Sequence, residues 1–211
     1  MLVILNWNYL ISILISVLAA LIAIIIHEVA HGYTAYLMGD KTAKTDGRLS
    51  LNPLKHIDWI GAVCLVLFHF GWAKPVPVNP YFFKNRRLGI VLVSLAGPLS
   101  NFILAILAII GLCICDIFVL NVLFFQFFYT LSAVSLGLGI FNLIPIPPLD
   151  GSKIFAQLLP INARIKYLNF ERYGWIILFL LIYFGNFTTY LGIARDHILI
   201  WLFNLIAGVI L

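Results

Sequence analysis

Long apolar segments recur along the whole sequence. They limit the folds that this chain can adopt more than any other feature does. The 211 residues are 63% hydrophobic and only 10% charged, whereas an ordinary soluble domain is roughly 45–50% apolar and about 25% charged. A helix of about 20 apolar residues crosses the hydrocarbon core of a bilayer. In lipid every backbone polar group must be satisfied internally, and an α-helix achieves this within one segment. We therefore expect an all-α polytopic membrane protein.

Five apolar segments are candidate membrane helices, and they cover residues 9–38, 88–115, 119–144, 173–193 and 198–211. The apolar run 57–70 is short for a span, so we expect a re-entrant or interfacial segment there. GWAKPVPVNP, residues 71–80, contains three prolines, which favour an extended or β segment or a loop over a helix. No polar block or linker sets off a second domain. We expect one membrane-embedded domain over residues 1–211.

The charged residues predict how the chain is oriented. The net charge is +5, and the basic residues lie mostly in two loop regions, 40–87 and 145–172. They form no basic face, so we expect the lipid bilayer and not a nucleic acid as the partner of this chain. The two basic regions are separated by two spans and thus fall on the same side, which the positive-inside rule makes cytoplasmic. We expect a multi-pass protein of the cell membrane with its N-terminus outside.

The first apolar segment contains three ionisable residues, His27, Glu28 and His31. An ionisable side chain at the centre of a membrane helix costs roughly 2.5–3.5 kcal/mol, so such a group indicates a functional site. The pattern is H-E-x-x-H. Positions i and i+4 share a helix face, so the two imidazoles can bind one zinc ion while the glutamate acts as general base. The alternative is a polar cluster that joins helices or relays protons.

Asp150 is the candidate for the third protein ligand that a catalytic zinc requires. It follows a span end interrupted by prolines, in the sequence PIPPLDG. Irregular backbone at membrane depth is tolerated where it is buried in protein or lines a wet cavity. Asp116 would lie at the opposite membrane face, and the acids of the basic loops are explained as solvated charges. The alternative for Asp150 is a residue of an ordinary Asp-Gly turn.

Three motifs occur in order along the chain: HEVAH at 27–31, AGPLSN at 96–101 and NLIPIPPLDG at 142–151. With these motifs, the chain resembles the site-2 protease family of intramembrane zinc metalloproteases over residues 20–160. LNPLKHIDWIG and GWAKPVPVNP, which lie between the first two motifs, are similar to the short bacterial and archaeal members with a minimal membrane core.

The resemblance implies a Zn2+ cofactor and a transmembrane protein or peptide as the substrate, cut within or near the bilayer. It implies that His27, His31 and Asp150 bind the zinc and that Glu28 is the catalytic base. It also places Gly97, Asn101 and Asn142 near the site, where an amide could bind substrate or stabilise the oxyanion. The alternative for Gly97 and Asn101 is close helix packing and interhelical hydrogen bonding.

Two other functions remain open from the residues alone. A metal-ion transporter would need ionisable residues on the path to the opposite face, where the sequence has little beyond Asp116 and Asp196. A catalytically silent homologue that binds membrane helices would have no need of Glu28. The sequence thus favours the intramembrane metalloprotease, and it does not predict an oligomeric state.

Overall fold

The computed structural model describes residues 7–56, 58 and 74–210. This part of the chain is helical and contains no strand. Four of its helices are long and apolar enough to cross a membrane: α1 (Trp7–Leu37), α4 (Arg86–Ile117), α5 (Val122–Asn142) and α9 (Phe187–Ile210). The shorter elements are α2 (Thr42–Thr45), η1 (Pro53–Lys55), η2 (Pro80–Phe82), α6 (Asp150–Leu158), α7 (Ile161–Asn169) and α8 (Glu171–Phe184).

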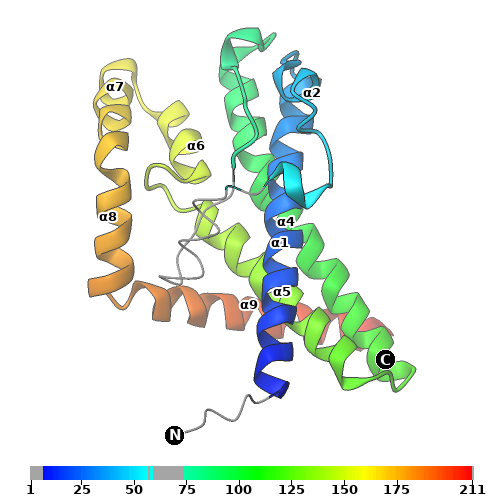
Figure 1. Cartoon of the computed structure of the whole chain (residues 1–211). Coiled ribbons are helices and arrows are strands. Elements are labelled where there is room, and N and C mark those ends of the chain that lie inside the picture. Colours follow the sequence, from blue (N-terminus) through cyan, green and yellow to red (C-terminus); the bar gives the residue numbers. More distant parts are fainter. Residues whose placement is uncertain (1–6, 57, 59–73, 211) are drawn as a thin grey trace, which may run out of the picture.

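Helices α1, α4 and α5 pack together into the centre of the fold (Figure 1). Small residues allow this close packing: Ala19 of α1 and Ala108 of α4 meet Leu131 of α5 in one buried cluster. A second cluster joins Ala105 of α4 to Leu199 of α9. Most large apolar side chains on the outer faces are exposed, as expected of surfaces that face lipid.

An asparagine caps the N-terminus of α4 and another caps the N-terminus of α5. The side chain of Asn85 accepts a hydrogen bond from the N–H of Leu88 at the start of α4. Asn121 does the same for the N–H of Leu123 at the start of α5. Each cap satisfies one N–H that the first turn of a helix leaves without a partner. The two asparagines therefore determine where α4 and α5 start.

The last two helices differ from the predicted ones. The sequence predicted spans over 173–193 and 198–211, separated at Arg195–His197. In the structure α8 ends before Gly185, and α9 continues through residues 195–197 without a break. The charged residues are accommodated inside α9, because Arg195 pairs with Asp196 at 2.7 Å. With 14 residues, α8 is about 21 Å long, less than the roughly 30 Å hydrocarbon core. The structure therefore has four candidate spans in the described residues and does not confirm five. Figure 1 shows α9 crossing α4 and α5.

The proline-rich segment lies beside α1. Residues 74–79 are neither helix nor strand, which fits the predicted loop, and the β alternative is not confirmed. The Asn79 N–H donates to Asp40 at 2.6 Å, and the Lys84 N–H donates to the Met38 carbonyl at 3.0 Å. These bonds hold the segment against the end of α1. The predicted re-entrant run 57–70 lies outside the described residues except for residue 58.

Candidate metal centre

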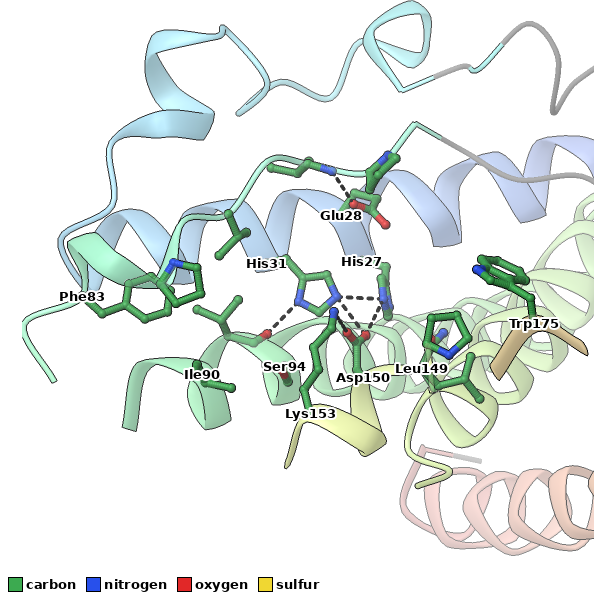
Figure 2. Close-up of a pocket in the computed structure, with 17 residues that line it drawn as sticks. His27, Glu28, His31, Phe83, Ile90, Ser94, Leu149, Asp150, Lys153 and Trp175 are labelled. Atoms are coloured by element: carbon green, nitrogen blue, oxygen red, sulfur yellow. Dashed lines mark hydrogen bonds and ion pairs between the residues drawn. The ribbon is translucent and has the colours of Figure 1, made fainter. Parts of the chain in front are cut away.

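Two histidines of α1 point their Nε2 atoms toward one another. His27 and His31 are both buried, and they lie one helical turn apart, as the spacing of four residues predicts. Their rings meet edge to face with centroids 4.5 Å apart, and their Nε2 atoms are 2.9 Å apart (Figure 2). The two imidazoles thus face the same point in space.

Asp150 completes the group from the first residue of α6. Its Oδ2 atom lies 3.1 Å from Nε2 of His27 and 3.0 Å from Nε2 of His31. The glycine that follows is needed for this placement, because a Cβ at Gly151 would lie 2.1 Å from the carbonyl oxygen of Leu143. The Asp-Gly pair therefore opens a helix that packs against the end of α5, and the carboxylate faces the histidines.

The hydrogen bonds behind the histidines set their proton positions. His31 Nδ1 donates to the carbonyl oxygen of Val93 at 2.7 Å, which leaves a lone pair on Nε2 of the neutral ring. The side-chain nitrogen Nδ2 of buried Asn101 lies 3.1 Å from Nδ1 of His27, and the Oδ1 of this amide has no hydrogen-bond partner in the described part of the chain. A ring that binds metal through Nε2 carries its proton on Nδ1, and turning the amide by about 180° brings Oδ1 to the position where it accepts that proton. Asn101 thus supports His27 from behind.

The geometry of this group fits a zinc ion. Three lone-pair atoms converge with separations of 2.9, 3.0 and 3.1 Å, and a cation between them would relieve their mutual repulsion. Ligand atoms on a tetrahedral zinc are about 3.3 Å apart, given bonds of about 2.0–2.1 Å. Two imidazoles and one carboxylate are a ligand set that zinc enzymes use. Within the described residues, this is the one group of three potential ligands that could hold a metal ion.

Gly97 of α4 provides the space for the two rings. A Cβ at this position would lie 2.4 Å from Nε2 of His31 and 2.6 Å from Cε1 of His27. Contacts under 3.0 Å require something to move, and here the groups that would move are the candidate ligands. The family resemblance implied that Gly97 lies near the site, and the close approach of the two rings gives a steric reason for a glycine at this position.

Lys153 was not singled out from the sequence, yet its Nζ atom lies 3.2 Å from Oδ1 of Asp150. The ammonium group engages one carboxylate oxygen, and the other oxygen faces the histidines (Figure 2). The i,i+3 spacing on a helix predicts this pair once α6 is known to begin at Asp150. The side chain of Lys153 is half exposed, so it extends from the buried group toward the surface.

Glu28 is held by the proline-rich segment. Its Oε2 atom accepts a hydrogen bond from the N–H of Val76 at 2.8 Å. Figure 2 shows the glutamate on the side of the histidines that faces this segment. The sequence could not predict Val76 as a partner, because the group that contacts Glu28 belongs to the backbone.

Glu28 and the candidate ligands line one cavity of about 840 Å³. Its wall comes from α1, residues 75–83, α4, the end of α5, α6 and α8, and it includes Pro75, Val76, Val78, Phe83, Ile90, Ser94, Asn142, Lys153 and Trp175. Asn142 lines the cavity and its side-chain amide donates to the carbonyl oxygen of Leu138 at 3.0 Å. Asn101 lies behind His27 and is fully buried. The predicted residues therefore come together, but the two asparagines take different places.

Asp40 ties the far end of the proline-rich segment to the turn after α1. Its carboxylate accepts bonds from the N–H of Thr42 at 2.9 Å, the hydroxyl of Thr42 at 2.5 Å and the N–H of Asn79 at 2.6 Å. Burial raises the pKa of Asp40, but these hydrogen bonds outweigh burial and lower the pKa below its ordinary value. The carboxylate is therefore ionised at neutral pH and can hold the segment in place.

The comparisons with known proteins agree with this chemistry. The model of peptidase family M50 matches residues 118–185, which include Asp150 and not HEVAH. The chain is 43% identical over 185 residues to "Putative zinc metalloprotease YwhC" of Bacillus subtilis, covering 82% of this chain and 84% of that protein. It is 33% identical over 132 residues to "Putative zinc metalloprotease Rip2" of Mycolicibacterium smegmatis, covering 60% of this chain and 50% of that protein.

A more distant relative carries the same kind of name. The chain is 31% identical over 136 residues to "Zinc metalloprotease MJ0392" of Methanocaldococcus jannaschii, covering 64% of this chain and 32% of that protein. No solved structure gives a significant match. These relatives, together with the ligand set, identify zinc as the implied metal.

Proposed function

The chain belongs to peptidase family M50, the site-2 protease family, and from this premise we propose that it is an intramembrane zinc endopeptidase that cleaves transmembrane proteins or peptides. One observation carries the proposal. His27, His31 and Asp150 converge on one point, and Glu28 lines the same cavity between helices of membrane-spanning length. A structural polar cluster would need neither a converging ligand set nor a further carboxylate in the same cavity.

The proposed roles of the residues follow from their positions. His27, His31 and Asp150 would hold the zinc, which when bound supplies a Lewis acid that polarises the scissile carbonyl and activates water. Glu28 is the general base, and Oε1 takes the proton from the attacking water because Oε2 accepts the Val76 N–H. The same carboxyl then returns the proton to the amine that leaves, so Glu28 ends the cycle ionised again.

The two asparagines receive different proposed roles. Asn101 orients His27 through the hydrogen bond to Nδ1, a contact of the kind that fixes tautomer and ring orientation at zinc sites. Asn142 lines the cavity, so its amide is the one that could reach the substrate carbonyl after its bond to Leu138 breaks. Gly97 contributes the room that the imidazoles need.

The cavity suits an unwound apolar peptide. Its wall contains Val76, Val78, Phe83, Ile90 and Trp175, which match the apolar side chains of a transmembrane segment. A helical substrate hides its peptide bonds in internal hydrogen bonds, so it must unwind before hydrolysis. Residues 74–79 form no helix and border the cavity, and a segment of this kind can pair with an extended peptide.

We place the site in the cytoplasmic half of the membrane. The basic residues of α2, of the start of α4 and of α7 lie at one end of the fold, which is the upper end in Figure 1. The turn between α4 and α5 lies at the opposite end. The positive-inside rule assigns the basic end to the cytoplasm, and the candidate ligands are nearer to that end along α1.

Cleavage of a model transmembrane substrate by the purified protein tests the function. The wild type should cleave, removal of zinc with a chelator should abolish cleavage, and re-addition of zinc should restore it. Glu28→Gln should bind zinc normally and lose activity by about 100-fold or more, because general-base catalysis contributes about 10²–10⁴-fold. Glu171→Gln, which changes an exposed glutamate at the start of α8, is the matched control and should cleave normally.

The same preparation separates the protease from the other functions. A transporter would move zinc across proteoliposomes and leave the substrate intact. A silent homologue would bind the substrate without producing fragments. Full cleavage by Glu28→Gln would show that the base is assigned to the wrong residue.

A further inference from the structure

Arg48 is a buried cation that the proposed chemistry does not use. It lies in the loop after α2 and is only 8% exposed. Its guanidinium donates to three backbone carbonyl oxygens: those of Lys55, of Lys74 at 2.7 Å and of Pro75 at 3.0 Å. A guanidinium presents a rigid fork of five donors and can bridge several acceptors at once. Arg48 thus connects two separate stretches of loop backbone.

One of these bonds reaches the peptide group that contacts the proposed base. The carbonyl oxygen of Pro75 and the N–H of Val76 belong to the same peptide unit, which is planar. Arg48 holds the oxygen of this unit, and Glu28 accepts the hydrogen bond from its N–H at 2.8 Å. In a trans peptide unit these two groups point in opposite directions, so Arg48 and Glu28 hold the plane from both sides. The position of Arg48 therefore sets the direction of the N–H that orients Glu28.

Packing on α1 also brings together the loop that contains Arg48 and the segment that contains Val76. A Cβ at Gly32 would lie 2.7 Å from Cδ2 of Leu49 and 2.8 Å from Cγ1 of Val76. The residue after Arg48 and the residue that contacts Glu28 thus both rest on the helix at Gly32, four residues beyond Glu28. The Lys74 N–H adds a bond to the carbonyl oxygen of His56 at 2.9 Å. The Pro75–Val76 unit has little freedom to rotate as long as Arg48 is in place.

We propose that Arg48 is a positioning residue for catalysis, which clamps the Pro75–Val76 peptide so that its N–H holds the Glu28 carboxylate in the orientation that takes the proton. The inference rests on the proposed function of Glu28 as the general base. Arg48 contacts none of the candidate ligands and does not itself line the cavity, where it reaches only the carbonyl oxygen of the wall residue Pro75. Its loss should therefore change the rate of the chemical step and leave zinc binding intact.

Steady-state cleavage of the model substrate by Arg48→Gln and Arg48→Lys tests this role. We expect Arg48→Gln to lower kcat about 10- to 100-fold, since a misplacement of about 1 Å can cost 10²-fold. The KM and the zinc content of the folded protein should change little, whereas the melting temperature should fall because three carbonyl oxygens lose their donor, so kcat is expressed per folded protein. Arg48→Lys should recover only part of the rate, because an ammonium group lacks the planar fork that bridges separate carbonyls. Lys44→Gln removes an exposed cation in the same region, which contacts Tyr36, and should keep the wild-type kcat.

A double-mutant cycle shows whether the effect passes through the peptide unit. Val76→Pro removes the N–H that Glu28 accepts, whereas Val76→Ala retains it. Val76 also lines the cavity, so Val76→Ala measures what loss of the side chain alone costs. If the inference is correct, Val76→Pro has a lower kcat than Val76→Ala, and adding Arg48→Gln lowers kcat further in the Val76→Ala background but not in the Val76→Pro background. Equal losses from Arg48→Gln in the Val76→Pro and Val76→Ala backgrounds would overturn the proposal, as would a wild-type kcat for Arg48→Gln.

The outcomes for the two proposals are distinct. If the wild type does not cleave, or if Glu28→Gln cleaves normally, the proposed function is wrong. If those two proteins behave as expected and Arg48→Gln loses activity only in proportion to lost zinc or lost folded protein, Arg48 has a structural role alone and the inference is wrong. Arg48→Lys retains the buried charge, so it decides the question where Arg48→Gln does not fold.

Discussion

At the scale of single residues, Gly97 links the packing of α4 to metal binding. Because a Cβ there would lie within 2.6 Å of both imidazoles, Gly97→Ala must push the rings away from Asp150 or push α4 away from α1. We expect the zinc affinity to fall about 10- to 100-fold, the usual effect of disturbing the residues that orient metal ligands. Competition with a zinc-binding dye measures this affinity directly.

Gly192→Ala is the matched control for this prediction. Gly192 is also helical, and its Cβ would meet nothing within 4 Å, so alanine there should leave zinc affinity unchanged. It should even stabilise the helix, since glycine costs roughly 0.5–1 kcal/mol relative to alanine in a helix interior. Equal zinc affinities for the two variants and the wild type would show that the rings do not depend on the space at Gly97.

The chemical groups of the candidate site could be predicted from the sequence better than the residues that hold them in place. His27, Glu28, His31 and Asp150 were recognisable because ionisable groups and a helix-breaking turn are anomalous in apolar segments. Arg48 was not recognisable, since a basic residue in a basic loop has an ordinary explanation in membrane orientation. Its partners are backbone carbonyls, and every residue type offers that acceptor.

At the scale of elements, the helices were predicted well where the sequence alone determines their ends. The apolar segments 88–115 and 119–144 correspond to α4 and α5, whose asparagine caps and intervening turn are local features. The predicted break between the last two spans was wrong because Arg195 and Asp196 neutralise each other within one helix. The course of residues 74–79 depends on hydrogen bonds to Asp40 and Glu28, and no local pattern encodes such contacts.

Asp40 joins two elements, and its contribution should depend on pH. Its pKa is lowered in the folded protein, so the carboxylate stabilises the fold above its unfolded pKa of about 3.9, and this stabilisation is lost as the pH falls below that value. Asp40→Asn should lower the unfolding free energy by about 1–3 kcal/mol at pH 7, because an amide cannot replace both accepting oxygens. Thermal unfolding in detergent should therefore show a gap in unfolding temperature between wild type and variant that stays constant from pH 7 to about pH 5 and narrows as the pH falls below about 4.

Asp46→Asn provides the comparison for Asp40. Asp46 is an exposed acid in the same loop region, and its substitution should leave the unfolding temperature within experimental error over the whole pH range. Other carboxylates titrate in all three proteins, so the difference between each variant and the wild type isolates a single group. A gap for Asp40→Asn that does not narrow as the pH falls from about 4 to about 2 would show that the ionised form of Asp40 is not what holds the two elements together.

At the scale of the whole molecule, the arrangement of charge leads us to expect that water reaches the proposed site from the basic end of the fold. α4 has 32 residues and is about 48 Å long, which exceeds the roughly 30 Å hydrocarbon core. Because Arg86 and Arg87 begin this helix, we expect its basic end to extend beyond the core into the interface. Lys153 is half exposed and contacts Asp150, so a polar side chain connects the candidate metal group to the surface. Access from the basic end would bring water to Glu28 without crossing the apolar half of the fold.

This access route requires that the basic end faces the cytoplasm, and cysteine labelling tests the orientation. In a background with the three native cysteines replaced, Lys44→Cys in α2 and Lys166→Cys in α7 should react with a membrane-impermeant maleimide only in inverted vesicles. Val119→Cys, which lies 88% exposed in the turn between α4 and α5, should react only in right-side-out vesicles. The reason is that α4 lies between residues 44 and 119 and α5 lies between residues 119 and 166, so each pair should be separated by one membrane crossing. The positive-inside rule predicts which side is cytoplasmic. Labelling of residues 44 and 119 from the same side would contradict the crossing, and the reverse pattern would place the metal group in the outer half of the membrane.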